Sequence, residues 1–294
     1  MQKEKVLVVG LGEVGRPLYE ILVENGLFSV SALDIDEEKM REARAAPPEG
    51  KVDVMHICIP YHSRREFIEA ALGYIRRFDP GITIINSTVP PGTTEELKRK
   101  AGCPVAHSPV RGVHRSLEHM KWELRRWTKY IGGADAESAG LASEHFRKLG
   151  LRVKALRSSR ETELAKLFET TYRAWMITCF QEMHRISRRL NVDFDQVADF
   201  LEDTHRVRFD RPVMFPGFIG GHCLIPNVEL LLETCESKFL RLILESNEER
   251  RREMEDEAVR EEVERIKRRV DRLEGEMTKL WKLLTQEKTD QHAV

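Results

Sequence analysis

The sequence predicts an α/β fold in its first half and helices alone in its second half, and two patterns carry this prediction. Between residue 5 and about residue 156, short apolar runs alternate with stretches of helical periodicity. Such alternation is typical of a parallel sheet whose strands are joined by helical crossovers. Near the C-terminus, apolar residues recur instead at alternating intervals of four and three. This is the heptad spacing of a long helix that packs along one seam.

The elements of the predicted sheet follow one another in chain order. We expect strands in the runs KVLVVG, SVSALD, DVMHICIP and ITIINST, at residues 5–10, 29–34, 53–60 and 82–88. The helices between and after them are expected at residues 15–25, 63–78 and 94–101. An amphipathic stretch at 136–149 leads to 152–156, which resembles a last strand of the same layer. The first domain is expected to close there.

The second half begins with a long predicted helix. Ser158 and Glu161 have the spacing of a capping box, so this helix should begin at 158–162 and continue to about Leu190. A further helical segment follows through Phe200. Residues 206–227 are rich in glycine and proline, which indicates a loop where the backbone approaches something closely.

The last 50 residues carry eight apolar residues at heptad spacing. These residues are Val259, Val263, Ile266, Val270, Leu273, Met277, Leu280 and Leu284. With Val263 at position a, Glu262 and Arg269 fall at g and are opposite in sign to Lys267 and Glu274 at e. A parallel coiled-coil homodimer would use such pairs. The alternative is a single helix that packs on its own globular body. We therefore divide the chain into a sheet domain at 1–157, an all-α central domain at 158–244 and a charged helix at 245–294.

Composition excludes several classes of protein. The 294 residues include 48 basic and 49 acidic side chains, for a net charge of −1, which argues against a large uniform field for nucleic acid or a membrane. Basic clusters at 157–160 and 250–252 are better interpreted as solvated faces. No stretch approaches the roughly 20 apolar residues of a membrane span, and the first residues do not resemble a signal peptide. We expect a globular, cytoplasmic protein without nucleic-acid or membrane partners.

The five cysteines, at positions 58, 103, 179, 223 and 235, are odd in number and form no CxxC pair. This spacing indicates neither a disulfide framework nor a zinc site, and we expect no bound metal. Cys58 in a strand and Cys179 on a helix are interpreted as small buried apolar residues.

A glycine-rich turn follows the first predicted strand and opens the first helix. It has the sequence Gly10-Leu11-Gly12-Glu13-Val14-Gly15. In this context GxGxxG is the fingerprint of a dinucleotide-binding Rossmann domain, because its glycines permit the tight turn, the approach to pyrophosphate and close helix–strand packing. The alternative is a glycine turn that binds nothing.

An acidic residue ends the second predicted strand. Asp34 can accept hydrogen bonds from the ribose hydroxyls of an adenosine, and its charge would repel a 2′-phosphate, so the pattern predicts NAD rather than NADP. Asp36 is the competing candidate, although Asp34 lies closer to the strand end. Pro60, at the end of the third strand, completes the expected cofactor contacts.

Three further motifs occur in a fixed order. They are Asn86-Ser87-Thr88-Val89-Pro90-Pro91-Gly92-Thr93-Thr94, Glu163-Leu164-Ala165-Lys166-Leu167 and Pro216-Gly217-Phe218-Ile219-Gly220-Gly221-His222-Cys223. Together with the glycine turn they resemble the UDP-glucose/GDP-mannose dehydrogenase family of nucleotide-sugar dehydrogenases, particularly its N-acetylhexosamine branch. The resemblance extends from about residue 5 to residue 232.

The resemblance implies a two-step, NAD-dependent oxidation of a primary alcohol of a sugar to a carboxylate. Cys223 matches the family nucleophile that would capture the aldehyde, and its flanking glycines admit a substrate close to the sulfur. Lys166 or His222 could favour its thiolate. Lys166 matches a lysine that stabilises negative charge on the substrate oxygen, although an exposed helix lysine is the simpler alternative. Thr88 matches a threonine near the cofactor and the catalytic water.

The same resemblance supplies substrate contacts. They are Lys166, Thr170, Arg206, Gly217, Gly220, Gly221 and Asn227. The long helix resembles the family's dimer-forming central helix, so the resemblance also implies a homo-oligomer.

Three matched positions depart from the family pattern. Val110 stands where the family has a glutamate, Thr170 where it has an asparagine, and Asn227 where it has an aspartate. Valine cannot transfer a proton and an amide cannot act as a base, and each lost acid or base typically lowers a rate on the order of 10²–10⁴-fold. Local replacements could come from nearby side chains, namely His107, Arg111, His114 and His222.

A larger departure follows the last motif. The family carries a third domain that holds the nucleotide, whereas 71 residues follow Cys223 here and most belong to the charged helix. We therefore expect a substrate that is smaller, that is held by a partner, or that is no longer turned over.

Two hypotheses result. The first is an NAD-dependent oxidoreductase acting on an alcohol of a sugar or sugar nucleotide, with a two-electron variant in which Lys166 acts and Cys223 is vestigial. The second is a catalytically impaired NAD-binding homologue that serves as a sensor or an oligomeric scaffold.

Overall fold

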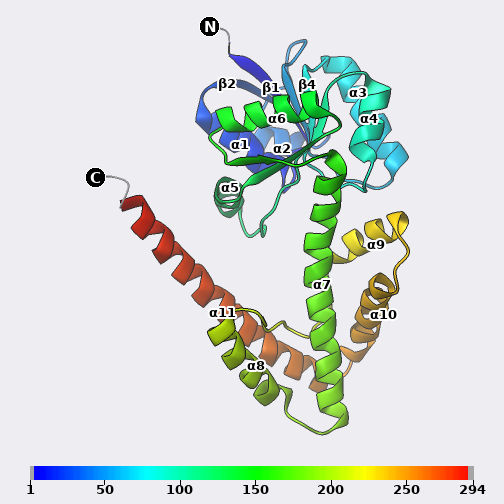
Figure 1. Ribbon diagram of the computed structural model, residues 1–294, viewed down its shortest axis with the longest axis vertical. Coiled ribbons are helices and arrows are strands. Elements are labelled where there is room, and N and C mark those ends of the chain that lie inside the picture. The colour runs from blue at the N-terminus through cyan, green and yellow to red at the C-terminus, as the bar shows by residue number, and fades with distance from the viewer. Residues whose placement is uncertain (1–2, 291–294) are drawn as a thin grey trace. The chain divides into compact units, whose positions relative to one another are not determined.

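A computed structural model describes residues 3–290 of the chain, with side chains described as far as residue 276. The chain divides into two compact units, Met1–Phe168 and Glu169–Val294, which we name the sheet unit and the helical unit. The division falls inside the long helix α7 (Ser159–Arg189), whose predicted start at 158–162 is confirmed (Figure 1). No helix among the described residues combines the length and the apolar character needed to cross a membrane.

The described part of the sheet unit holds a seven-stranded sheet with the strand order β2-β1-β3-β4-β5-β6-β7. The strands are β1 (Glu4–Val9), β2 (Phe28–Leu33), β3 (Val54–Ile57), β4 (Ile82–Ile85), β5 (Val105–His107), β6 (Lys129–Gly133) and β7 (Val153–Ala155). The four strands predicted first and the last strand of the layer are confirmed, and all neighbours run parallel except β5 and β6. The α/β fold class is therefore confirmed, with one antiparallel step that the sequence pattern did not predict.

Helices cover both faces of this sheet. They are α1 (Gly15–Asn25), α2 (Glu37–Glu42), α3 (Arg64–Phe78), α4 (Thr93–Ala101), α5 (Leu117–Arg126) and α6 (Ala136–Lys148). Alternate residues of β1 enter two cores: Val6 and Val8 pack with side chains from α1, α5 and α6, whereas Leu7 and Val9 pack with those from α3 and α4 (Figure 1). A strand buried on both faces must be apolar at successive positions, which explains the run KVLVV.

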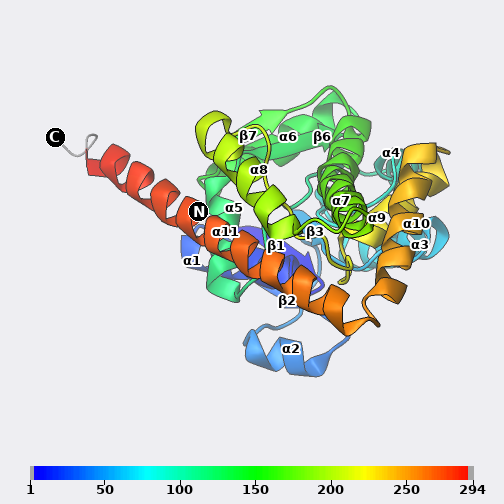
Figure 2. The same ribbon diagram turned by 90° about the horizontal axis from the view of Figure 1, so that it is seen from below.

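The helical unit contains the rest of α7 with four further helices. These are α8 (Phe194–Arg208), α9 (Leu224–Thr234), α10 (Lys238–Glu253) and α11 (Glu257–Asp290). The predicted segment through Phe200 is therefore longer than expected, and α9 begins inside the stretch expected to be a loop. Helices α8 and α11 lie side by side in both views (Figure 2).

The first half of the heptad seam is buried inside the helical unit. The exposed fractions of Val259, Val263, Ile266 and Val270 are 5%, 1%, 1% and 8%. These four residues therefore pack on the body of their own chain, as the alternative interpretation of the seam predicts. The side chains of Met277, Leu280 and Leu284 lie outside the described residues.

The charged residues expected to face a second helix also find partners within the unit. Glu262 lies 2.9 Å from the guanidinium of Arg188, and Glu274 lies 3.1 Å from that of Arg173. Arg269 contacts three carboxylates of α8. Because these ion pairs form inside one chain, the charge pattern at the g and e positions no longer requires a coiled-coil partner.

Candidate functional site

The glycine turn is built by close backbone packing at two of its three glycines. Gly10 follows β1 with φ +91°, and a Cβ there would lie 2.6 Å from the carbonyl oxygen of Cys58. A Cβ on Gly15, the first residue of α1, would lie 1.8 Å from the carbonyl oxygen of Gly10. Gly12 differs, because a Cβ there would meet no atom within 4 Å. The protein itself therefore needs Gly10 and Gly15, whereas the open space at Gly12 fits a bound group.

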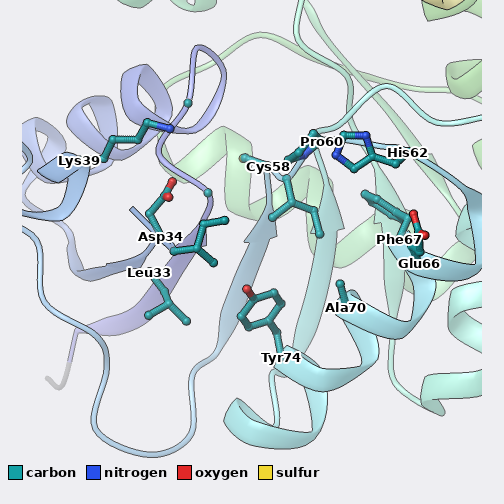
Figure 3. Close-up of a pocket in the computed structure, with 14 residues that line it drawn as sticks. Leu33, Asp34, Lys39, Cys58, Pro60, His62, Glu66, Phe67, Ala70 and Tyr74 are labelled. Carbon is teal, nitrogen blue, oxygen red and sulfur yellow. The ribbon is translucent and has the colours of Figure 1, made fainter. Parts of the chain in front are cut away.

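A cavity of about 420 Å³ opens beside this turn (Figure 3). Its lining comes from the carboxyl ends of β1, β2 and β3 and from α3, and includes the predicted Gly10, Gly12, Asp34 and Pro60. In the sheet, β1 lies between β2 and β3, so the strand order continues to one side of β1 with β2 and to the other side with β3. Doubly wound sheets bind their ligands at such a point. Glu13, Val14 and Gly15 continue the turn into α1.

The two candidate carboxylates have different surroundings. Asp34 lines the cavity and accepts hydrogen bonds from the backbone N–H groups of Leu11, at 2.5 Å, and Asp36, at 2.9 Å. Asp36 instead caps α2 by accepting from the N–H of Glu38 at 3.0 Å. The structure therefore places Asp34, and not Asp36, where a ribose could be bound.

The sequence analysis did not predict the opposite wall of the cavity. Phe67, Ala70 and Tyr74 of α3 face Leu33 and Asp34 across it (Figure 3). Their spacing of three and four residues places them on one helix face, which is a signal that the sequence contains. Because the same spacing is typical of any buried helix face, it could not mark a ligand wall.

The segment after β4 is held by hydrogen bonds to two other parts of the sheet unit. Ser87 donates a hydrogen bond to the carbonyl oxygen of Ile59, a cavity residue, at 2.6 Å. Glu163 of α7 accepts from the backbone N–H groups of Gly92 and Thr94 at 2.7 and 2.9 Å. Thr88, the predicted neighbour of cofactor and water, is half-buried within this fixed segment, outside the lining of the cavity.

Glu163 caps the first turn of α4 with a buried carboxylate. Burial raises the pKa of this carboxyl to about 7, although hydrogen bonds from Thr94 and Gly92 act in the opposite direction. It thereby joins α7, one turn before Lys166, to the segment that carries Thr88. The sequence motif contained Glu163, but its spacing could not show which backbone groups it binds.

Buried basic groups surround the place of the missing glutamate. The ammonium of Lys129 donates to the carbonyl oxygens of Ser108 and Pro109 at 2.9 and 3.2 Å, and burial lowers its pKa to about 7. Burial also lowers the pKa of His107 to about 3. The half-buried Lys166 acts on both by charge repulsion.

Val110 lies in the apolar core beside α5. It is 6% exposed and belongs to the same buried cluster as Met120 and Leu124. The side chain at this position is therefore a packing residue, and the sequence analysis missed Lys129 as the nearby titratable group.

Cys58 directly follows β3 and lies in the wall of the cavity. Burial raises the pKa of its thiol to about 12, so it remains protonated near neutral pH. This agrees with its interpretation as a small apolar residue.

Cys223, the nucleophile that the resemblance implies, lies in the helical unit. It is exposed and is the N-cap residue of α9, and helix N-termini stabilise thiolates. Gly220, Gly221 and His222 before it are also exposed, and Gly221 adopts φ +80°. This part of the loop is open to a substrate.

The preceding part of the loop is fixed by the helices. Gln181 of α7 donates to the carbonyl oxygen of Gly217 at 2.8 Å, and Asn247 of α10 exchanges two hydrogen bonds with the backbone of Ile219. Gly217 is buried, and a Cβ there would lie 3.1 Å from the side chain of Val263. Its position is therefore set by packing.

Two positions that depart from the family pattern contact each other in the helical unit. The side-chain amide of Asn227 donates to the hydroxyl oxygen of Thr170 at 3.0 Å. Asn227 is 6% exposed and Thr170 is half-buried. An asparagine and a threonine thus satisfy each other where the resemblance implies an aspartate and an asparagine.

Arg206 lies near the end of α8. Its guanidinium is 2.8 Å from Glu202 and 3.3 Å from Glu276. Contact with a substrate would require these ion pairs to be shared. Within the described residues, no group of three or more histidine, cysteine or carboxylate side chains could hold a metal ion.

Parts of this chain are similar to known proteins. Residues 160–249 match the model of the UDP-glucose/GDP-mannose dehydrogenase family, central domain. UDP-N-acetyl-D-mannosamine dehydrogenase of Methanocaldococcus jannaschii is 27% identical over 287 residues, which cover 83% of this chain and 65% of the relative. The helical part of the chain is therefore similar to the central domain of that family, and the chain spans about 65% of the length of these curated relatives.

Solved structures agree on the fold. The UDP-D-ManNAc dehydrogenase from Pyrococcus horikoshii matches 83% of this chain and 68% of its own, with a TM-score of 0.70 at 23% identity. The 3-hydroxyisobutyrate dehydrogenase of Mycobacterium tuberculosis matches 87% of this chain and 95% of its own, with a TM-score of 0.63 at 15% identity. A sheet unit followed by helices therefore accounts for nearly all of at least one solved dehydrogenase chain.

Proposed function

We propose that the sheet unit binds NAD and that the chain is a dehydrogenase acting on a CH–OH group of a sugar or sugar nucleotide. One observation carries the proposal: the glycine turn, the open side of Gly12 and the carboxylate of Asp34 meet at a single cavity. The names of the curated relatives, which are dehydrogenases of UDP-sugars and of GDP-mannose, support the substrate class.

The cavity residues fit the adenosine half of NAD. Asp34 can accept hydrogen bonds from ribose hydroxyls, and the N-terminus of α1 offers partial positive charge to the pyrophosphate. Ile35, which is 94% exposed, joins Ile59 and Tyr74 in an apolar lining that suits an adenine ring.

The bound nicotinamide would accept hydride, and the protein side chains would supply binding and charge. Lys166 of α7 would donate a hydrogen bond to a substrate oxygen as negative charge develops there. Cys223 would add to an aldehyde, so that its sulfur forms the new bond while the aldehyde oxygen takes a proton. A second hydride transfer from that adduct would give a thioester, which water would hydrolyse to the acid.

Cofactor choice is the first test. Titration of the purified protein with NAD and with NADP, followed by intrinsic fluorescence or calorimetry, should show tighter binding of NAD. Asp34→Ala should weaken NAD at least about tenfold, on the scale of a hydrogen bond to a charged group. Asp36→Ala is the matched control, because it removes a cap of α2 from outside the cavity, and it should leave the affinity within about twofold. Equal affinity for NAD in both variants would contradict the assignment.

Catalysis is the second test. A panel of sugar nucleotides, sugars and hydroxy acids should reduce NAD, as followed by NADH absorbance. Lys166→Met and Cys223→Ala should each lower the rate by a factor on the order of 10² or more. Full activity in both variants would overturn the assigned residues, and an aldehyde or ketone as sole product would select a two-electron reaction in which Cys223 is not used.

A second candidate function is an NAD-binding homologue that senses redox state or serves as a scaffold. The buried Val110 and the Thr170–Asn227 hydrogen bond favour it, since neither offers a base. NAD binding without turnover across the panel would support this candidate, and turnover at ordinary enzyme rates would exclude it.

Homo-oligomerisation belongs to the same proposal. One face of α7 carries apolar residues at intervals of three and four that are exposed or half-buried, and Leu190 directly after the helix continues the spacing. These residues are Tyr172, Trp175, Cys179, Met183 and Ile186. A second copy of the chain would cover such a stripe. Light scattering should give a lower mass for Met183→Lys with Ile186→Lys. Truncation after residue 276, which keeps the buried part of the seam, tests the separate coiled-coil hypothesis in the same way. A cytoplasmic location suits five cysteines that form no disulfide.

A further inference from the structure

A chain of three hydrogen bonds crosses one buried face of the sheet. It runs from Glu4 in β1 to His145 of α6, then to His56 of β3 and to Asn86 after β4. The carboxylate oxygen of Glu4 lies 3.3 Å from Nδ1 of His145. The two Nε2 atoms of the imidazoles lie 3.0 Å apart, and Nδ1 of His56 lies 2.9 Å from Oδ1 of Asn86. The proposed dehydrogenase mechanism uses none of these four side chains.

Both ends of this chain are hydrogen-bond acceptors. The side-chain amide nitrogen of Asn86 donates to the carbonyl oxygen of Ser108 at 2.8 Å, so the amide oxygen must be the atom that faces His56. The carboxylate of Glu4 is an acceptor when it is ionised. Two imidazoles therefore lie between two acceptors.

A count of protons shows that this series of three hydrogen bonds lacks one proton if both imidazoles are neutral. Each of the three contacts needs a proton between its two heavy atoms, whereas two neutral imidazoles carry one N–H each. The exposed fractions of His56 and His145 are 0% and 2%, so water cannot replace the missing donor. A buried acceptor pair without a proton would be strongly unfavourable.

We infer that the folded protein binds a third proton in this chain, at the contact between His145 and Glu4, and that His145 is thereby a positioning residue for Asn86. The fixed amide of Asn86 then begins the 86–94 segment that carries Thr88.

The surrounding groups place the third proton at one end. Burial and the nearby charge of Lys129 hold the pKa of His56 well below its usual range, so His56 is neutral. The hydrogen bond from His145 lowers the pKa of Glu4, which keeps that carboxyl ionised. Lys148 of α6 lies 3.1 Å from the second carboxylate oxygen, and the rings of Phe28 and Phe146 pack against His145.

The contact between Glu4 and His145 couples stability to pH. Stability falls as pH decreases through the folded pKa of Glu4, which lies below the unfolded value. Glu4 is the outer end of this series of hydrogen bonds, because its side chain is 22% exposed, whereas Asn86 is 2% exposed.

The test is nitrogen NMR of the histidine rings in the protein without cofactor. Near pH 7, His145 should carry protons on both ring nitrogens, and His56 should carry one on Nδ1 alone. A bare Nδ1 on His145 in the wild-type protein would overturn the inference. This readout requires no NAD, so failure of the proposed dehydrogenase function would leave it intact.

Two variants at position 4 sharpen the test. Glu4→Gln supplies an amide N–H to Nδ1 of His145, so the chain needs no third proton, and His145 should become a neutral Nε2–H tautomer. Glu4→Ala removes the partner altogether. The side-chain amide signal of Asn86 should shift in Glu4→Ala and return to its wild-type position in Glu4→Gln.

Lys148→Gln is the matched control, since it removes the other partner of Glu4 and leaves the three contacts in place. It should keep the doubly protonated His145 and the acid loss of stability that comes from Glu4, whereas Glu4→Gln should lose both. Identical unfolding profiles against pH for the wild type and Glu4→Gln would contradict the inference.

Discussion

In the sheet unit the cofactor motif is present at every position, whereas in the helical unit two matched positions carry different side chains that contact each other. Backbone atoms leave no space for a Cβ at Gly10 or Gly15, whereas Gly12 and Asp34 line a cavity. Asn227 and Thr170 form a hydrogen bond in place of the implied acid and amide. Under the proposed function, the sheet unit offers the geometry for binding a dinucleotide, whereas the helical unit differs at positions to which the resemblance assigns the water step. The predictions below test each side of this comparison, from the largest expected effect to the smallest.

Val263→Asp should have the largest effect, because it tests what the heptad seam is for. Val263 is 1% exposed inside the helical unit, and a buried unpaired charge there should lower the free energy of unfolding by about 4 kcal/mol or more. Denaturant unfolding measures this loss. Lys267→Asp, at an exposed position of the same helix, is the control. A lower oligomer mass with unchanged stability would show instead that the seam joins two chains.

Gly15→Ala and Gly12→Ala should separate folding from binding within one motif. A methyl at Gly15 would collide with the backbone of Gly10 and should cost about 3 kcal/mol of stability. A methyl at Gly12 meets no protein atom, so thermal unfolding should be unchanged while NAD affinity falls. A large drop in melting temperature for Gly12→Ala would mean that its open side is not a ligand space.

The same contrast explains how much the sequence could predict. The glycine turn, its strand and Asp34 are contiguous or close in sequence, so spacing alone placed them correctly at the cavity. Lys129 and Glu163 escaped because their partners lie 20 to 71 residues away and are backbone atoms, which no side-chain motif reveals. Heptad spacing reports a buried helix face but not whether the same chain or a second chain covers it, so it could not decide between the two readings of α11.

Lys129→Met should change the pH dependence of stability. The pKa of Lys129 is lowered to about 7, so between that value and its unfolded pKa the unfolded chain binds more protons, and stability should rise with pH. The penalty for burying the charge is fully present below pH 7. Unfolding measured at pH values two units apart on the alkaline side should show a rise of about 2 kcal/mol in the wild type, and little rise in the variant. Lys154→Met, at an exposed lysine, should keep the wild-type slope, and an unchanged slope in Lys129→Met would refute the assignment.

The smallest effect on stability, and the most direct one on chemistry, is expected at Asn227. Asn227→Ala removes the 3.0 Å hydrogen bond to Thr170 and should cost about 1 kcal/mol in chemical denaturation. Asn227→Asp can still accept a hydrogen bond from the Thr170 hydroxyl, so its stability should stay closer to that of the wild type. It also restores the carboxylate that the family pattern implies, which can act as a base where an amide cannot. If the chain is a dehydrogenase whose water step was lost with this residue, Asn227→Asp should raise the ratio of acid to aldehyde among the products, as measured by mass spectrometry. An unchanged ratio alongside normal NAD binding would mean that the replaced pair never limited the water step, and that the difference between the two units lies elsewhere, with Val110 the next position to test.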